Sequence, residues 1–260
     1  MFTLKVVRNG QALKCETGEY RADLVFEGEY EPGDKITLTS DKYPVDIVLQ
    51  VDDALKESVC LLTGDFEFEI PFLEKRTSYS KKVFIGDCHY MYVRLAEEFE
   101  VYQYKNLALN ANDQHGDTHL FPHAYANVET RGEAVFAARN AIDGVCENRS
   151  HGNWPYESWG INRRDDAAMT VDFGREVLID KIVLYTRADF PHDNWWESVT
   201  FNFSDGSSYT AKLTKSYDRH IIELDKRVVT WVTFTDLIKA DDPSPFPALT
   251  QMEVYGNVKA

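Results

Sequence analysis

The sequence lacks the features that mark several large classes of protein. No apolar run approaches the roughly 20 residues that a membrane helix requires. The first residues, MFTLKVVRNGQ, contain no continuous apolar segment of the kind found in secretory signals. Lys and Arg total 28 against 43 Asp and Glu, a formal charge of −15 without any basic block. Because phosphate binding depends on clustered Lys and Arg, this balance argues against DNA or RNA as a partner.

Cysteine is scarce and widely spaced. The four residues, Cys15, Cys60, Cys88 and Cys146, form no CxxC pair, so neither a zinc ribbon nor a thioredoxin-like site is indicated. Without a signal peptide, the expected location is a reducing cytoplasm in which the thiols are free and buried. An extracellular location follows instead if a leader has been removed.

The first hundred residues have the pattern of short strands separated by turns. Residues 2–7 alternate in polarity and run into Asn9-Gly10, a signal for a tight hairpin. Further strands are expected at 23–26, 35–39, 45–51, 66–70, 83–85 and 89–95. Strands at roughly ten-residue spacing predict an antiparallel β-sandwich over residues 1–105.

The pattern changes near residue 105. Residues 110–130 are rich in Asn, Asp, His and Gly and are expected to form loops. Strands are expected again at 168–174, 179–185, 199–203, 209–213, 220–224, 228–234 and 249–255. Strands with long polar connections predict a second sandwich or jelly roll over residues 106–260. The predicted fold class is therefore all-β, with two domains that pack closely because no flexible linker separates them.

Segments of the second half occur in an order typical of one known family. They are residues 138–144 (ARNAIDG), 154–159, 169–174 (MTVDFG), 179–185 (IDKIVLY) and 251–256 (QMEVYG). Together they make residues 106–260 resemble the discoidin or coagulation factor type C domain. The resemblance implies a galactose-binding-like jelly roll, a fold shared by many bacterial carbohydrate-binding modules. It is less specific for the ligand, since such domains bind sugars, phospholipid headgroups or proteins.

The resemblance also implies a structural Ca²⁺ beneath the loop that AIDG begins. A hard cation of this kind takes about six to eight oxygen ligands, many of them backbone carbonyls. The implied side-chain ligands are Asp143 and Glu253, with carbonyl or hydroxyl oxygens from Asn140, Asn148 and Ser150. The alternative is that Asp143 belongs to a simple turn and that Glu253 is a solvated strand residue.

Two connecting segments hold most of the unusual side chains of the second half. A sugar presents an apolar ring face and a rim of hydroxyls, so its binder needs an aromatic platform and planar or charged groups. These groups are His151, Trp154 and Trp159 in the first segment, Arg163 just after it, and Arg187, Asp189, His192, Asp193, Asn194, Trp195 and Trp196 in the second segment. We expect them to form a saccharide site.

A purely structural interpretation of the same residues is also open. The Trp side chains could anchor loops to the core, Arg187 and Asp189 could form an internal salt bridge, and Arg163 could be solvated. For the adjacent Trp195 and Trp196, whose side chains diverge in an extended chain, one is expected in the core and the other at the surface.

Non-catalytic carbohydrate binding is the function that these patterns favour. A protein-interaction or scaffold role is the first alternative, because a cytoplasmic location suits a glycan binder poorly. A glycoside-active enzyme is the second, since Asp189, Asp193 and His192 could serve as acid and base. Against an enzyme, the sequence contains no GxSxG, Walker loop, dinucleotide fingerprint or HExxH.

Overall fold

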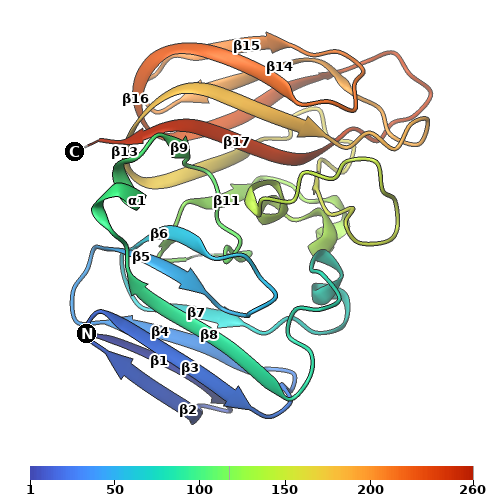
Figure 1. Cartoon of the computed structure of the whole chain (residues 1–260). Coiled ribbons are helices and arrows are strands. Elements are labelled where there is room, and N and C mark those ends of the chain that lie inside the picture. Colours follow the sequence, from blue (N-terminus) through green and yellow to red (C-terminus); the bar gives the residue numbers. More distant parts are fainter. Residues whose placement is uncertain (117, 260) are drawn as a thin grey trace.

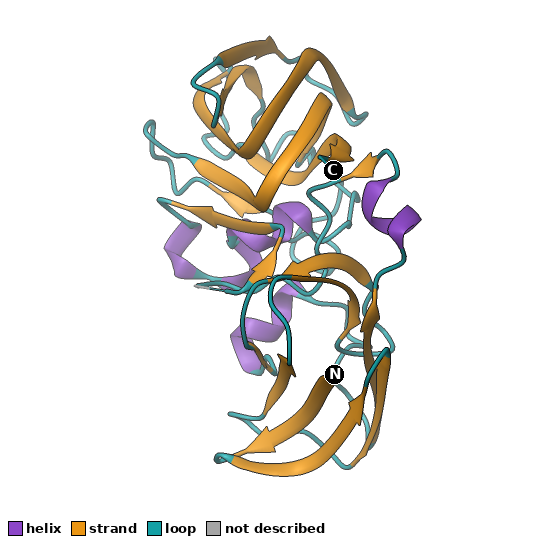
Figure 2. Ribbon diagram, turned by 90° about the vertical axis from the view of Figure 1, so that its left-hand side faces the viewer, coloured by secondary structure: helices purple, strands orange, loops and turns teal. Residues whose placement is uncertain are grey.

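The computed structural model describes residues 1–116 and 118–259, which form antiparallel sheets with a few short helices (Figures 1 and 2). The all-β fold class is confirmed. The strands are β1 (Phe2–Arg8), β2 (Gln11–Gly18), β3 (Arg21–Glu27), β4 (Lys35–Ser40), β5 (Val45–Gln50), β6 (Ser58–Leu62), β7 (Phe66–Glu69), β8 (Cys88–Leu95), β9 (Lys105–Asn106), β10 (Leu120–Phe121), β11 (His123–Ala126), β12 (Trp159–Gly160), β13 (Met169–Thr186), β14 (Trp196–Phe203), β15 (Ser208–Lys212), β16 (His220–Lys239) and β17 (Ala248–Val258). The helix is α1 (Glu98–Tyr102), and the 3₁₀ turns are η1 (Leu73–Ser78), η2 (Thr130–Gly132), η3 (Ala134–Phe136) and η4 (Ala138–Ile142).

The N-terminal part consists of two sheets, whose strands β1 to β8 are drawn in blue to blue-green in Figure 1, with strand orders β2-β1-β4-β7 and β10-β6-β5-β8-β3. Alternate residues of β1, Phe2, Leu4 and Val6, point into the core that the sheets enclose. The hairpin between β1 and β2 turns at Asn9 and Gly10, whose φ angles of 51° and 79° are both positive. A two-residue hairpin turn requires this geometry, which explains the Asn-Gly signal.

Some expected strand positions in this part are wrong. Residues 83–85 form a turn rather than a strand, and Phe84 has a φ of 58°. Strand β6 was not anticipated, because its five residues, SVCLL, show no alternation of polar and apolar side chains. The segment 110–130, expected as loop, contains the short strands β10 and β11.

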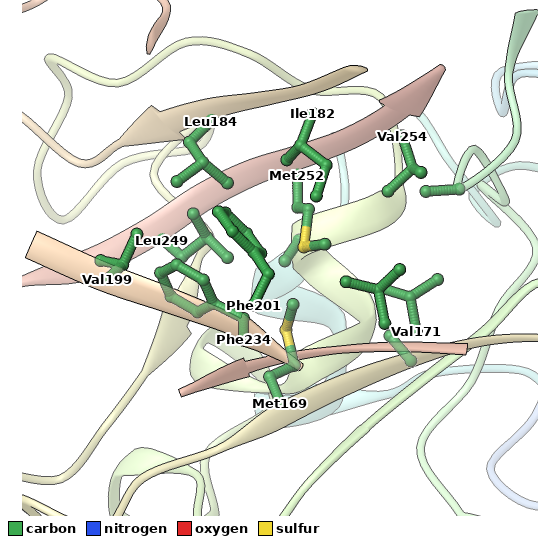
Figure 3. Close-up of a cluster of buried hydrophobic side chains, with 14 of the residues drawn as sticks. Met169, Val171, Ile182, Leu184, Val199, Phe201, Phe234, Leu249, Met252 and Val254 are labelled. Atoms are coloured by element: carbon green, nitrogen blue, oxygen red, sulfur yellow. The ribbon is translucent and has the colours of Figure 1, made fainter. Parts of the chain in front are cut away.

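The C-terminal part is organised by two long strands, each of which joins two of the expected strands. Residues 169–172 of β13 pair with β11 and with the second half of β16, whereas residues 177–186 pair with β17, and up to 184 also with the first half of β16. The register shifts between Asp172 and Val177, so the two ends of β13 pair as separate segments of one sheet. Side chains from β13, β14, β16 and β17 meet in the core around Phe201 and Phe234 (Figure 3).

Close contacts explain the glycines that end the segments 169–174 and 251–256. Gly174 has a φ of +67°, and a Cβ there would lie 2.6 Å from the Phe121 side chain. A Cβ on Gly256 would lie 2.0 Å from the backbone oxygen of Leu178 on the paired strand. Both positions therefore require glycine, the first for its backbone conformation as well as for space.

The N-terminal and C-terminal parts are in direct contact with each other. Strand β10 pairs with β6, which places Leu120 in the N-terminal core. Asp46 and Arg175 form an ion pair across the junction. Glu74 Oε1 accepts a hydrogen bond of 2.6 Å from the Ala134 backbone. The last of these contacts holds η1 against η3 of the C-terminal part.

The cysteines are free thiols, but only Cys60 is buried. The expectation of buried thiols is wrong for Cys15 and Cys88, which occupy exposed positions on β2 and β8. Among the residues described, no helix has both the length and the hydropathy needed to cross a membrane.

Candidate functional site

A pocket of about 610 Å³ opens where several connections of the C-terminal part meet. We call it the loop pocket. Its lining residues lie within 130–136, 151–156, 160–163, 187–193 and 245–248. Of the predicted ligand residues, the structure brings five to this pocket: His151, Arg163, Arg187, His192 and Asp193.

A buried ion pair forms the floor of the loop pocket. Arg187 directly follows β13, and its backbone N–H donates to the Ala248 carbonyl at the start of β17. The Arg187 Nε lies 3.1 Å from Asp193 Oδ2, and the two side chains are only 4% and 1% exposed. A buried guanidinium is tolerated because a carboxylate compensates its charge. The internal salt bridge considered for Arg187 therefore exists, but with Asp193 rather than Asp189.

The Asp193 carboxylate also organises the loop around it. Oδ2 accepts a hydrogen bond of 2.8 Å from the Asp189 backbone N–H. Oδ1 lies 2.9 Å from Nδ1 of His192, so the carboxylate fixes the orientation of that ring. One buried side chain thus sets the positions of Arg187, Asp189 and His192.

His151 completes this polar network from the opposite segment. Its Nδ1 is hydrogen-bonded to Nη2 of Arg187. Burial, together with the positive charge of Arg187, lowers the pKa of His151, which favours the neutral ring that can accept this hydrogen bond. The ring centroids of His151 and His192 lie 4.0 Å apart. The pocket therefore presents two adjacent imidazoles backed by a buried guanidinium.

The exposed aromatic surface of the pocket is Phe246, which is 41% exposed. The His192 ring lies nearly parallel to it, at 13° and a centroid distance of 5.5 Å. The Arg163 guanidinium lies 4.7 Å from the Phe246 centroid. Asn162 and Arg163 have φ angles of 48° and 58°, a left-handed conformation that asparagine tolerates but that costs an ordinary residue such as arginine about 1–2 kcal/mol. Strain of this kind is concentrated at functional sites.

The sequence did not point to Phe246, because the aromatic platform was expected among the Trp residues. Phe136 and Tyr156 also line the pocket and were likewise missed. One usable signal was present: Phe246 stands between Pro245 and Pro247, immediately before the family-like segment of β17. An aromatic side chain held between two prolines in a connection is rigid and cannot be part of a continuous strand.

Trp159 and Trp196 are core residues, which corrects their assignment to the ligand site. Both are fully buried and contact Phe234 edge-on. Trp159 Nε1 donates to the Val128 carbonyl at 2.9 Å. Neither ring has any surface left with which to contact a sugar.

The remaining predicted ligand residues lie outside the loop pocket. Asn194 is buried, and its Nδ2 donates to the carbonyls of Ala240 and Ser244, so it shapes a loop. Trp195 is half-buried beneath Lys215, whose Nζ lies 4.8 Å from the ring centroid. Asp189 lies beside the pocket, with Oδ2 3.8 Å from His151 Nδ1. Trp154 lines a neighbouring groove.

The side chains implied as Ca²⁺ ligands fit that role only in part. Asn140 Oδ1 accepts a hydrogen bond of 3.0 Å from Arg139 Nη1, and this guanidinium would repel a cation. Glu253 Oε2 accepts a hydrogen bond from the Tyr255 hydroxyl. Asn148 Nδ2 donates to the Tyr217 carbonyl, and Ser150 is half-buried. Among these five, Asp143 is the carboxylate that is buried.

Further buried oxygens belong to Glu157, whose charge acts on Asp143, to Gln251, and to their chain neighbours Ser158 and Thr250. Together with Asp143 we call these five residues the oxygen cluster. Burial, together with the nearby negative charge of Glu157, raises the pKa of Asp143 to about 8. Gln251 Oε1 accepts a hydrogen bond of 3.2 Å from Gly144 N. Glu157 Oε1, Ser158 Oγ and Thr250 Oγ1 are buried without a hydrogen-bond partner in the described part of the chain. Carboxylate, amide and hydroxyl oxygens are the donors that Ca²⁺ takes.

One further set of side chains is close enough together to coordinate a metal ion. Ligand atoms of His151, Asp189 and His192 lie within 4.8 Å of one another. However, the Arg187 guanidinium bonded to Nδ1 of His151 places a positive charge beside this set. A transition metal here would have to displace that hydrogen bond.

Comparison with known proteins gives structural similarity alone. No protein-family model matches the sequence, and no curated protein is significantly similar to it. Chitosan-binding module 1 of a chitosanase/glucanase from Paenibacillus sp. IK-5 is 22% identical, with a TM-score of 0.41 over 58% of this chain and 98% of the module. A fucose-binding module from Streptococcus pneumoniae is 16% identical, with a TM-score of 0.40 over 58% of this chain and 96% of the module. The family 32 carbohydrate-binding module of C. perfringens NanJ, in complex with galactose, is 17% identical, with a TM-score of 0.38 over 51% of this chain and 91% of the module.

Proposed function

We propose that the protein binds a saccharide, without chemical conversion, in the loop pocket. The observation that carries this proposal is the buried Arg187–Asp193 pair, which orients His192 beside the exposed ring of Phe246. The part of the ring that His192 and Arg163 leave exposed offers a platform for the apolar face of a sugar. His151, His192 and Arg163 supply donors and acceptors for hydroxyls around that platform.

The arrangement of the carboxylates supports binding rather than hydrolysis. A glycosidase needs two carboxyl groups that are free to contact the scissile bond. Both oxygens of Asp193 are already engaged, by Arg187 and the Asp189 backbone on one side and by His192 on the other. Asp193 therefore positions its neighbours. The other carboxylates are Asp189, beside the pocket, and Glu133, which lines it and accepts hydrogen bonds from Arg131 on both oxygens.

The test is the effect of Phe246→Ala on saccharide affinity. A glycan array first identifies the sugar class, and isothermal titration calorimetry then gives Kd for the best ligand. We expect at least about a tenfold weaker affinity, because the variant loses both the stacking surface and the apolar area it covers. The matched control is Phe99→Ala, since Phe99 is 66% exposed on α1 and does not line the pocket.

Two results would contradict this proposal. The first is an array on which the wild-type protein binds no glycan. The second is an equal loss of affinity in the Phe246 and Phe99 variants, which would place the ligand elsewhere. A protein partner bound independently of sugar would favour the scaffold role.

We also propose that a Ca²⁺ ion is held by the oxygen cluster rather than by the full set that the resemblance implied. When bound, the ion would add positive charge beside two buried carboxylates that share the single guanidinium of Arg139, and it would join the loop after η4 to β17. Three observations support this: the buried Asp143, the buried Glu157, and the hydroxyls of Ser158 and Thr250 without partners in the described chain. Asn140 is excluded by its contact with Arg139.

Millimolar Ca²⁺ is expected to raise the Tm of the protein, and EDTA to reverse the effect. The stabilisation is about 2.7 kcal/mol when the Ca²⁺ concentration is 100 times Kd. Asp143→Asn should remove most of this response, because a ligand with full negative charge is lost. Glu253→Gln should retain it, since Glu253 is directed toward Tyr255. The reverse order of the two variants, or a wild-type Tm indifferent to Ca²⁺, would refute the proposal.

A further inference from the structure

A second hollow, of about 460 Å³, lies next to the loop pocket and is shared between the two parts of the chain. We call it the Trp154 groove. One wall comes from the N-terminal part and includes Leu73 and Thr77 of η1 and Ile85. The other wall is the segment around Asn153 and Trp154, which connects η4 to β12. The N-terminal part thus contributes directly to a surface beside the proposed sugar site.

The Trp154 groove and the loop pocket are continuous. Gly152 and Tyr156 line both of them. Between these two shared residues, the chain presents Asn153 and Trp154 to the groove, whereas His151, immediately before them, lines the pocket. A ligand longer than the loop pocket would therefore pass over this segment into the groove.

The side chains of the groove combine the two features that a sugar requires. Apolar surface is supplied by the half-buried ring of Trp154 and by Leu73 and Ile85, which are 91% and 50% exposed. Polar groups on Asn153 and Thr77 line the same hollow. Leu73 has a φ of 51°, so an apolar residue is kept fully exposed in a conformation that leucine disfavours. Packing within the chain explains neither its exposure nor its strain.

Direct contacts fix the N-terminal wall of the groove against η3 and η4 of the C-terminal part. The Glu74 carboxylate accepts a hydrogen bond from the Ala134 backbone, and the Arg139 guanidinium lies 4.6 Å from the Tyr79 ring centroid. Tyr79 itself lines the groove. A preformed groove costs a ligand less ordering than one assembled on binding.

We propose that the ligand is an oligosaccharide that spans the loop pocket and the Trp154 groove, with residues 73–85 of the N-terminal part forming a second subsite. This inference rests on the proposed function, because the loop pocket anchors one end of the chain. It assigns a role to the N-terminal part, for which the sequence indicated none. It also defines the ligand class: a chain of sugars is bound more tightly than a single sugar.

The experiment measures Kd across ladders of one to six sugars, using N-acetylglucosamine, glucosamine, glucose and galactose oligomers. For the full-length wild-type protein, we expect affinity to rise about five- to tenfold between the single sugar and the longer members, from one aromatic stacking contact and its buried area. Trp154→Ala should remove this gain while leaving the affinity for the single sugar unchanged. Trp154→Phe should restore part of it, because phenylalanine keeps an aromatic face.

The N-terminal wall is tested by Leu73→Asn. Asparagine tolerates the left-handed conformation better than leucine, so the fold is retained while the apolar surface is lost. This variant should reduce the gain with chain length and leave the affinity for the single sugar unchanged. The matched control for Trp154→Ala is Trp195→Ala, because Trp195 is also a half-buried tryptophan but lines neither hollow.

The outcomes separate the two proposals. If single sugars and long oligomers bind with equal affinity, or if Trp154→Ala weakens both equally, the second subsite is refuted while sugar binding in the loop pocket stands. If no ladder member binds the wild-type protein, the proposed function fails and the second subsite fails with it. Capture of a protein by the Trp154 groove without any sugar would also overturn the inference.

Discussion

Asp193→Asn is expected to lower the free energy of unfolding by about 3–5 kcal/mol, because it leaves the buried Arg187 guanidinium without its charge partner. The same substitution should weaken saccharide binding at least about tenfold, since Asp193 also fixes His192 and the backbone of Asp189. Urea unfolding and calorimetry on the folded protein measure the two effects.

Two control variants make this prediction specific. Asp189→Asn changes the same chemical group on the same loop, but Asp189 is a third exposed, so the expected loss of stability is at most about 1 kcal/mol. In the double variant Arg187→Leu with Asp193→Asn, no buried charge is left unpaired, and part of the stability should return. Sugar binding should not return. Equal costs for Asp193→Asn and Asp189→Asn would show that the pair is not buried as described.

Trp196→Ala is expected to destabilise the protein by about 3–5 kcal/mol through the cavity left in the C-terminal core. Trp196 is fully buried and contacts Phe234 edge-on at a centroid distance of 5.5 Å. Trp196→Phe should cost less than half as much, because most of the packing volume is kept. Thermal or urea unfolding measures both.

The decisive readout for Trp196 is affinity per folded molecule. As a core residue it should leave Kd unchanged when binding is measured well below the unfolding transition. Trp195→Ala, its half-buried neighbour, should cost far less stability. A loss of affinity with intact stability in Trp196→Ala would instead return this side chain to the ligand site.

Strand positions were predictable where local pattern and turn chemistry agree. Asn9-Gly10 determines its own hairpin, since only such residues adopt two consecutive positive φ angles readily. The strict alternation in β1 and β7 likewise indicates which side chains face a core. Strand β6 was not predicted, because its continuous apolar run shows no alternation of polar and apolar side chains. The union of two strands in β13 was not predicted, because the strand continues through Gly174 although residues 173–176 have no partner in its ladders with β16 and β17.

The site was predicted less completely, because sequence marks residue types and not directions. The segments around His151 and Arg187 were recognised as unusual, and the structure brings these two residues together. Composition could not distinguish Trp154, which lines a groove, from Trp159, which lies in the core five residues later. Nor could it show that Phe246, far along the chain, would supply the exposed aromatic surface of the loop pocket.

The sequence by itself determined that the chain is all-β and that polar and aromatic groups concentrate in two connections of the second half, and its charge argues against nucleic acid as a partner. These are properties of period, charge and local composition, which act within a few residues. Tertiary structure alone decided that Arg187 pairs with Asp193, that Phe246 faces the pocket, and that residues 73–85 reach the proposed sugar site. Burial and contact between distant segments set these features, because they depend on which strands become neighbours in space.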